Sequence, residues 1–245
     1  MELTKLQRDI YARQLLLEDC GEAGQARLLQ GAALVCGCGG LGSSAAYYLS
    51  ALGIGRLGLI DGDVVSPSNL NRQILYTRAD LGQSKVVSAA RRLRELNPEL
   101  RLDVHQCYVD AGNVDRLIAA YDIVVDCLDN FPARLLLNDA CVAAGKPLVH
   151  AGVYNCGGQQ LTVNPGHGPC LRCVFPDGAD DDADGKYKGI IGAAAGVFGS
   201  LQALQAYKFY MGLPLNDQGF LCLANNGEWS FFPVERRKGC ICGKK

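Results

Sequence analysis

The sequence has 245 residues, of which 49% are hydrophobic and 20% are charged, and its formal net charge at pH 7 is −1. This length and composition predict one large α/β domain or two small ones, and they exclude an intrinsically disordered chain. The charge balance argues against a general nucleic-acid or membrane-surface binder, because no excess of positive charge is available to hold phosphates.

Apolar periodicity predicts that helices and strands alternate along most of the chain. Helices are expected over 1–30, 43–52, 83–96, 113–120, 132–144 and 190–211, and strands over 32–36, 56–60, 100–107, 123–127, 147–153, 159–163, 220–224 and 229–234. Repeated βα units predict a doubly wound, mostly parallel Rossmann-like sheet, which the strands after Gly157 extend with antiparallel partners. The acidic stretch 175–188 has no periodicity and is predicted to be a mobile loop.

The sequence opens without a basic segment followed by an apolar run, and none of its apolar runs reaches membrane length, so we expect a cytoplasmic protein. Twelve cysteines are present, and four of them form two tight pairs, at 170 and 173 and at 240 and 242. In a reduced compartment, paired cysteines indicate a metal site more than a disulfide.

A glycine-rich turn follows the first predicted strand. It contains Gly37, Gly39, Gly40 and Gly42. Glycines let the backbone turn sharply and approach a phosphate, and the next helix presents free N–H groups at its N-terminus. A dinucleotide-binding turn has almost the same pattern, with Asp61 as its acidic residue, so the turn alone leaves both kinds of nucleotide open.

Polar and charged residues after the second predicted strand favour ATP over a dinucleotide. They are Asp61, Asp63, Asn69, Arg72, Gln73 and Lys85. A triphosphate needs several cations, whereas two bridged phosphates need few. Asp129 follows the strand at 123–127 and could hold Mg²⁺, which typically takes one or two carboxylates plus phosphate oxygens. For Arg72 or Lys85 taken singly, a solvated surface cation is the alternative.

The order and spacing of these motifs resemble the MoeB/ThiF/HesA family, the bacterial relatives of ubiquitin-activating enzymes. The resemblance covers nearly the whole chain. The residues that carry it are Arg13-Gln14, Gly37-Cys38-Gly39-Gly40-Leu41-Gly42, Asp61-Gly62-Asp63, Asn69-Leu70-Asn71-Arg72-Gln73, Gly82-Gln83-Ser84-Lys85, Asp126-Cys127-Leu128-Asp129-Asn130, Gly199-Ser200-Leu201-Gln202-Ala203 and the cysteine pairs.

The resemblance implies a role for each matching residue. ATP and Mg²⁺ would be bound by the four turn glycines together with Asp61, Asp63, Asn69, Arg72, Gln73, Lys85, Asp129 and Asn130. Within this set Asp61 would bind the ribose hydroxyls, and Asp129 would hold the magnesium. Arg13 matches an arginine that reaches the ATP phosphates of the partner subunit, which implies a homodimer; its alternative is a cation on a helix surface. Arg13, Arg72, Lys85 and Asp129 would be the catalytic residues.

The cysteine pairs are expected to form a structural zinc site. Cys170 and Cys173 have C-x-x-C spacing, which is typical of half of a tetrathiolate site. Cys240 and Cys242 would supply the other half, although their C-x-C spacing is one residue shorter than in the family. His167 is close enough in sequence to substitute as a ligand. A redox pair and a metal-free degenerate site are the alternatives.

The stretch 175–191 departs from the family because it contains no cysteine, where many relatives have one. The thiolate that would accept an acyl group is therefore missing from its usual place. Cys156 and Cys20 are candidate replacements, with a structural role as the alternative for each. An Asp-x-Asp-x-Asp-Gly run at 180–185 matches half of an EF-hand loop, but position twelve is Ile191 rather than Glu, so an acidic lid is expected instead.

We therefore expect a single adenylation domain over 1–245, with an N-terminal helical arm (1–30), a nucleotide-binding core (31–153) and a C-terminal sheet extension with the zinc site and crossover loop (154–245). The resemblance implies ATP-dependent adenylation of the C-terminal glycine carboxylate of a small ubiquitin-like sulfur-carrier protein. The products would be the acyl-adenylate and pyrophosphate, and a separate sulfur donor would then convert the adenylate to a thiocarboxylate. The alternatives are adenylation of a short peptide in antibiotic maturation, a NAD-dependent oxidoreductase and a zinc-bound scaffold with a decayed site.

Overall fold

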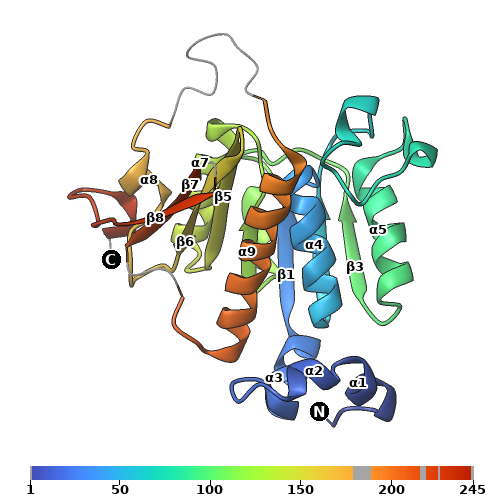
Figure 1. Cartoon of the computed structure of the whole chain (residues 1–245). Coiled ribbons are helices and arrows are strands. Elements are labelled where there is room, and N and C mark those ends of the chain that lie inside the picture. The colour runs from blue at the N-terminus through green and yellow to red at the C-terminus, as the bar shows by residue number, and fades with distance from the viewer. Residues whose placement is uncertain (1, 179–188, 216–218, 226, 244–245) are drawn as a thin grey trace.

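The computed structural model describes residues 2–178, 189–215, 219–225 and 227–243. Its strands are β1 (Ala32–Cys36), β2 (Arg56–Ile60), β3 (Arg101–His105), β4 (Ile123–Asp126), β5 (Leu148–Tyr154), β6 (Gly157–Val163), β7 (Phe220–Asn225) and β8 (Glu228–Pro233). These described strands form one sheet in the order β3-β2-β1-β4-β5-β6-β7-β8 (Figure 1). The pairings from β3 to β5 are parallel and those from β5 to β8 are antiparallel. The predicted fold class is confirmed.

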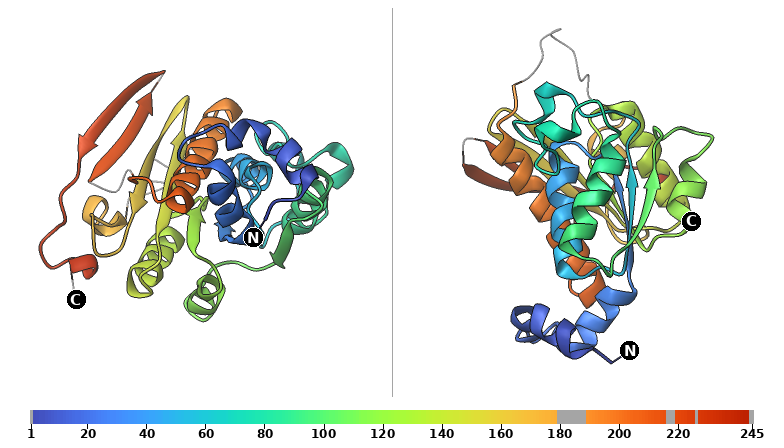
Figure 2. Two further views of the ribbon diagram at one scale, coloured as in Figure 1. Left: turned by 90° about the horizontal axis from the view of Figure 1, so that it is seen from below. Right: turned by 90° about the vertical axis from the view of Figure 1, so that its right-hand side faces the viewer.

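Helices cover both faces of the sheet (Figure 2). The α-helices are α1 (Lys5–Ile10), α2 (Ala12–Leu15), α3 (Gly21–Gln30), α4 (Gly40–Leu52), α5 (Lys85–Leu96), α6 (Val114–Ala119), α7 (Phe131–Ala143), α8 (Leu171–Val174) and α9 (Gly192–Met211). Short 3-10 helices are η1 (Pro67–Asn69), η2 (Arg78–Asp80) and η3 (Ile241–Gly243). Helices α4, α5 and α9 pack on one face, and α6 and α7 pack on the other.

The central strands are buried on both faces, which explains why β1 is an unbroken apolar run. Ala33 and Val35 belong to the core beneath α4 and α9, whereas Leu34 and Cys36 belong to the core beneath α6 and α7. The chain passes from β2 to β3 on the first face and from β3 to β4 on the second. This reversal at β1 and β4 opens a crevice beyond the carboxyl ends of the two strands, where ligands bind in open α/β sheets.

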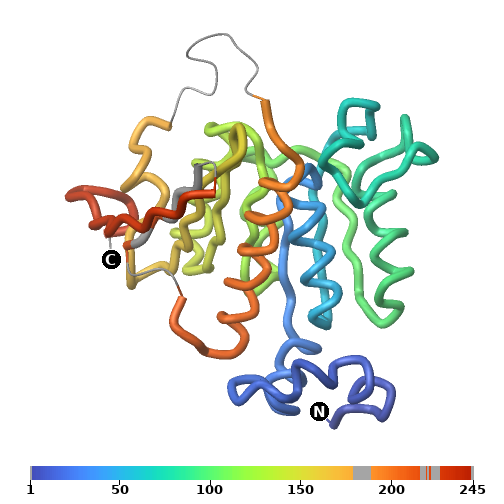
Figure 3. The backbone as a smooth tube through the Cα atoms, in the orientation of Figure 1, coloured from blue at the N-terminus to red at the C-terminus, as the bar shows by residue number. Residues whose placement is uncertain are grey.

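The N-terminal arm lies beyond the amino ends of the strands (Figures 1 and 3). The sequence predicted a helical stretch to residue 30, and the structure divides it into α1, α2 and α3. Thr4 caps α1 by accepting from the backbone N–H of Gln7, and this pair forms a capping box. Large apolar side chains on the arm are exposed, among them Leu6, Ile10 and Leu16.

The C-terminal sheet extension is held to the rest of the sheet by few pairings. β6 pairs with β7 at Gly158, Gln159 and Gln160, while β7 and β8 form a longer hairpin. The sequence did not predict α8, which is a single turn after the chain leaves β6. Residues 179–188, which include the acidic run and most of the predicted loop, lie outside the described residues.

None of the described helices combines the length and apolar character that a membrane crossing requires.

Candidate functional site

A cavity of about 1210 Å³ opens at the carboxyl ends of the parallel strands. Residues that follow β1, β2, β3 and β4 line it together with the first turn of α7 and residues just before α9. The predicted nucleotide-binding residues among its lining are Gly37, Gly39, Gly40, Asp61, Asp63, Arg72, Gln73, Lys85, Asp129 and Asn130. The cavity exceeds the usual range of pockets for drug-sized ligands, which is about 300–1,000 Å³.

The glycine turn forms the wall of this cavity beside β1. Gly37 has a positive φ of 93°, which an L side chain rarely adopts. Gly42 lies inside α4 rather than on the cavity lining, and a Cβ there would overlap the carbonyl oxygen of Gly37. Its role is therefore close packing of the helix against the turn. Helix α4 begins at Gly40, which places its free backbone N–H groups at the cavity.

A cluster of charged side chains lies at the end of β2. Lys85, at the start of α5, places its Nζ 2.7 Å from Oδ2 of Asp63 and 3.8 Å from Oδ2 of Asp61. The Lys85 side chain is only 8% exposed. Asp61 is fixed further, because its oxygens accept from the backbone N–H groups of Cys38 at 2.8 Å and Asp63 at 2.9 Å.

The charge state of Asp63 follows from these contacts. Hydrogen bonds from Lys85 and from the Tyr108 hydroxyl lower the pKa of Asp63 below its usual value, against a smaller opposing effect of burial. The Asp63 carboxylate is therefore ionised at neutral pH, and it holds the end of the Lys85 side chain through their 2.7 Å contact. The sequence did not predict a role for Tyr108, although its position in the segment that follows β3 is at the carboxyl edge of the sheet.

The segment before α5 supplies the other candidate phosphate ligands. Arg72 donates from Nη1 to the Ser68 carbonyl at 2.8 Å and to Asn71 Oδ1 at 3.0 Å, and it lines the cavity. Gln73 is 4% exposed, and its buried Oε1 has no hydrogen-bond partner among the described residues. Such an atom is costly unless a ligand or water satisfies it. Asn69 lies outside the cavity lining, and its Oδ1 accepts from the Ser66 N–H at 3.0 Å.

The loop after β4 carries Asp129 and Asn130. Asp129 is exposed at the cavity, and its Oδ1 accepts from the Asn130 side-chain amide at 3.3 Å. Asn130 also caps α7, because its Oδ1 accepts from the Ala133 N–H at 2.9 Å. Arg134 was not singled out from the sequence. It is 7% exposed, lines the cavity and donates from Nε and Nη2 to the Leu128 carbonyl at 3.1 and 2.7 Å.

Behind this loop lies a fully buried pair, Asp126 and His150. The imidazole Nδ1 is 2.7 Å from Asp126 Oδ2, and the other carboxylate oxygen accepts from the Leu128 N–H at 3.1 Å. Burial lowers the pKa of His150, and the nearby Asp126 only partly offsets this effect. A neutral imidazole that donates its Nδ1 hydrogen to the carboxylate satisfies both observations. This pair fixes the start of the loop that carries Asp129.

The predicted catalytic residue Arg13 lies far from the cavity of its own chain. It is exposed on α2, beyond the amino ends of the strands, whereas the cavity opens at their carboxyl ends (Figure 1). Arg13 therefore cannot act on a ligand in its own cavity.

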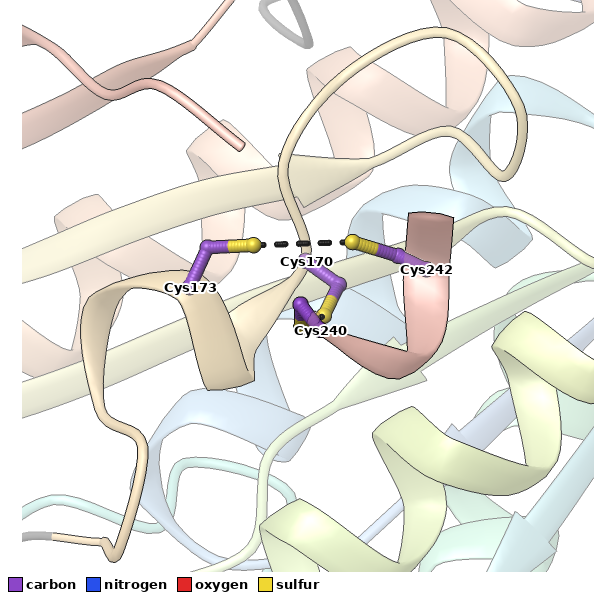
Figure 4. A group of neighbouring side chains, drawn as sticks. All are labelled: Cys170, Cys173, Cys240 and Cys242. Carbon is purple, nitrogen blue, oxygen red and sulfur yellow. Dashed lines mark hydrogen bonds between the residues drawn. The ribbon is translucent and has the colours of Figure 1, made fainter. Parts of the chain in front are cut away.

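The four paired cysteines converge at the C-terminal end of the chain (Figure 4). The Sγ atoms of Cys170 and Cys240 are 3.5 Å apart, as are those of Cys173 and Cys242, and all four lie within 4.8 Å of one another. These distances are too long for disulfides. A tetrahedral zinc ion with Zn–S bonds near 2.3 Å separates its sulfur ligands by about 3.8 Å, and the observed distances are close to this value.

The local backbone explains how the shorter C-x-C pair reaches this cluster. Residues 241–243 form η3, and the backbone N–H of Arg237 donates to Cys173 Sγ at 3.3 Å. His167 is not part of the cluster. Of the candidate acyl-accepting thiols, Cys20 is buried and burial raises its pKa, while Cys156 is exposed in the turn between β5 and β6.

Comparison with known sequences gives matches along almost the whole chain. The ThiF family model matches residues 11–242. The chain is 44% identical over 232 residues to "Adenylyltransferase and sulfurtransferase MOCS3" of Xenopus laevis, covering 93% of this chain and 51% of that protein. It is 41% identical over 249 residues to the "SAMP-activating enzyme E1" of Haloferax volcanii, covering 100% of this chain and 92% of that protein. The chain thus spans about half the length of the MOCS3 relative.

Comparison with solved structures gives the same fold at low sequence identity. A crystal structure of E. coli MccB with SeMet MccA has a TM-score of 0.83 at 22% identity, covering 96% of this chain and 74% of that one. The crystal structure of SeMet PaaA has a TM-score of 0.79 at 22% identity, covering 95% and 75%. At these identities the likeness concerns the fold alone.

Proposed function

Because this chain belongs to the ThiF family, we propose that it is an ATP-dependent adenylyltransferase for the C-terminal glycine carboxylate of a small ubiquitin-like sulfur-carrier protein. The observation that supports this most directly is one cavity in which Arg72, Lys85 and Asp129 meet the glycine turn. Relatives with 41% and 44% identity carry the names of a SAMP-activating enzyme and of an adenylyltransferase and sulfurtransferase, and these names support the proposal.

In the proposed reaction, a carboxylate oxygen of the carrier attacks the α-phosphorus of ATP. The bond from this phosphorus to the bridging oxygen of the β-phosphate breaks, and the electron pair leaves with pyrophosphate. The carboxylate is already ionised, so the step needs neither an enzyme nucleophile nor proton removal. The protein contributes position and charge neutralisation.

Different residues of the cavity are proposed to bind different parts of ATP. Lys85 is a buried point charge and Arg72 a planar fork, and both neutralise phosphate oxygens as pyrophosphate leaves. The backbone N–H groups of the glycine turn and of the first turn of α4 hold further phosphate oxygens. Asp61, fixed at the end of β2, binds the ribose hydroxyls.

Asp129 fits a magnesium ligand, because its exposed carboxylate faces the cavity and Mg²⁺ prefers oxygen ligands shared with phosphates. When bound, the ion would supply positive charge that offsets the negative charge of the phosphate oxygens. The loop that presents this carboxylate is held by Asp126 from behind and by Arg134 through the Leu128 carbonyl. These contacts keep Asp129 in one position before nucleotide arrives.

The active species is proposed to be a homodimer in which Arg13 of one copy reaches the phosphates bound by the other. The position of Arg13 supports this, because the side chain is exposed at the end of the molecule opposite its own cavity. Exposed Leu6, Ile10 and Leu16 on the same arm are apolar surface that a second copy would cover.

Zinc is proposed as a structural ion held by the four clustered cysteines. Their free thiols and their separations fit a tetrathiolate site. Sulfide, as the separate sulfur donor, then attacks the acyl carbon of the carrier adenylate. The bond from this carbon to the phosphate oxygen breaks, and AMP leaves with the electron pair as the thiocarboxylate forms.

Carrier-dependent exchange of labelled pyrophosphate into ATP tests this function. The substrate panel contains a Gly-Gly-ended ubiquitin-like protein, the same protein without its last glycine, and a short free peptide. We expect exchange only with the intact carrier, and thermal stabilisation by ATP–Mg²⁺ but not by NAD. Exchange with the peptide alone would instead indicate peptide adenylation, and stabilisation by NAD alone would indicate an oxidoreductase.

A further inference from the structure

Tyr108 lies at the cavity, three residues after the end of β3. Its ring packs against the backbone of Gly62, where a Cβ would come within 2.7 Å of the ring carbons. The phenol hydroxyl donates to Oδ1 of Asp63 at 2.6 Å. Tyr108 is 67% exposed, and the Gly62 backbone and this carboxylate contact its side chain.

Asp63 connects Tyr108 to Lys85. One carboxylate oxygen accepts from the tyrosine, and the other accepts from Lys85 Nζ at 2.7 Å. Asp61, the second carboxylate near this ammonium, is 9% exposed and is already fixed by two backbone N–H groups. Asp63 is 48% exposed, so its orientation depends more on the side chains that hold it.

This arrangement decides where the free hydrogens of Lys85 point. An ammonium has three donors on a flexible stem. The two carboxylates attract it from the side of β2, which leaves donor capacity for the cavity that Lys85 lines. If Asp63 rotates away, the ammonium loses its 2.7 Å partner and its direction is no longer fixed.

We propose that Tyr108 is a positioning residue that aims Lys85 at the phosphates by holding Asp63 in one orientation. This inference rests on the proposed function, because it takes the cavity to be the ATP site. It assigns the effect to the hydroxyl group and not to contact between the ring and the nucleotide. The hydroxyl is therefore the group to remove.

Tyr108→Phe removes the hydroxyl and keeps the ring. We expect it to raise the KM for ATP in pyrophosphate exchange, and the Kd for ATP–Mg²⁺ in calorimetry, by about threefold to tenfold. Tyr121→Phe is the matched control, because Tyr121 also donates to a carboxylate, that of Asp103, at 2.7 Å. Neither Tyr121 nor Asp103 lines the cavity. It should leave both constants unchanged.

A double-mutant cycle shows whether the effect passes through Asp63. Asp63→Asn should weaken ATP binding, and adding Tyr108→Phe to it should cause little further loss. Two results would overturn the inference while leaving the proposed function intact. One is a KM and a Kd for ATP in Tyr108→Phe that equal the wild-type values. The other is a loss of ATP affinity in the double variant that equals the product of the two single losses. If the wild-type protein itself does not bind ATP, the proposed function fails, and this inference fails with it.

Discussion

Replacing Cys173 with serine tests whether the cysteine cluster is a structural metal site. The cluster joins Cys170 to Cys240, which are 70 residues apart in sequence. A cross-link that closes a loop of this length lowers the entropy of the unfolded chain by an amount worth about 4 kcal/mol. In a chain of this size 1 kcal/mol moves Tm by about 2–4 °C, so loss of the entire cross-link would lower Tm by about 8–16 °C. Cys173→Ser leaves three thiolates, and we expect about half of that decrease.

Elemental analysis and calorimetry provide the assay. Wild-type protein, purified under reducing conditions without chelators, should contain one zinc per chain, and a strong chelator should lower its Tm toward that of the variant. Cys156→Ser is the control, because Cys156 is exposed and outside the cluster. It should match wild type in metal content and in Tm. Wild-type protein without metal, or Cys173→Ser with an unchanged Tm, would refute the reasoning.

Three further predictions concern catalysis. Arg72→Ala or Lys85→Met should slow pyrophosphate exchange about 10- to 150-fold, as expected when a charged hydrogen bond worth roughly 1.5–3 kcal/mol is lost; unchanged initial rates for both would contradict the site. The Arg13→Ala and Lys85→Met proteins should each be impaired, and mixing them should recover pyrophosphate exchange. In a mixed dimer, one site combines the intact Lys85 of one copy with the intact Arg13 of the other. Absence of recovery after subunit exchange would contradict a shared site. Carrier, enzyme and ATP–Mg²⁺ should give no thiol-sensitive conjugate on a non-reducing gel, and an adduct that disappears with Cys156→Ala would identify an acyl-accepting thiol.

The sheet could be predicted from the sequence because its parallel strands are buried on both faces. β1 and β2 have the predicted limits, since an apolar run ends there at a glycine or aspartate turn. α4 begins earlier than predicted, at Gly40, because the glycine turn itself adopts helical geometry. α8 was missed, since a single turn is too short to show periodicity.

The cavity residues were predictable where a motif or a strand end marks them, and less so elsewhere. Asp61, Lys85 and Asp129 line the cavity as the motifs suggested. Two neighbouring residues were missed. Arg134 donates to the Leu128 carbonyl and Tyr108 donates to Asp63, and spacing alone does not reveal such contacts. The cysteine pairs meet although the C-x-C spacing is short, because η3 turns the chain between them.

The central claim is that ATP reacts with the carboxylate of a glycine-ended carrier, and intact-mass spectrometry tests it most directly. Enzyme, ATP–Mg²⁺ and a Gly-Gly-ended carrier are incubated without a sulfur donor, beside the same carrier with a C-terminal amide. We predict that the carrier gains the mass of one AMP residue only when its carboxylate is free, and that sulfide then converts it to the thiocarboxylate. An unmodified carboxylate carrier, or equal modification of the amide, would contradict the account.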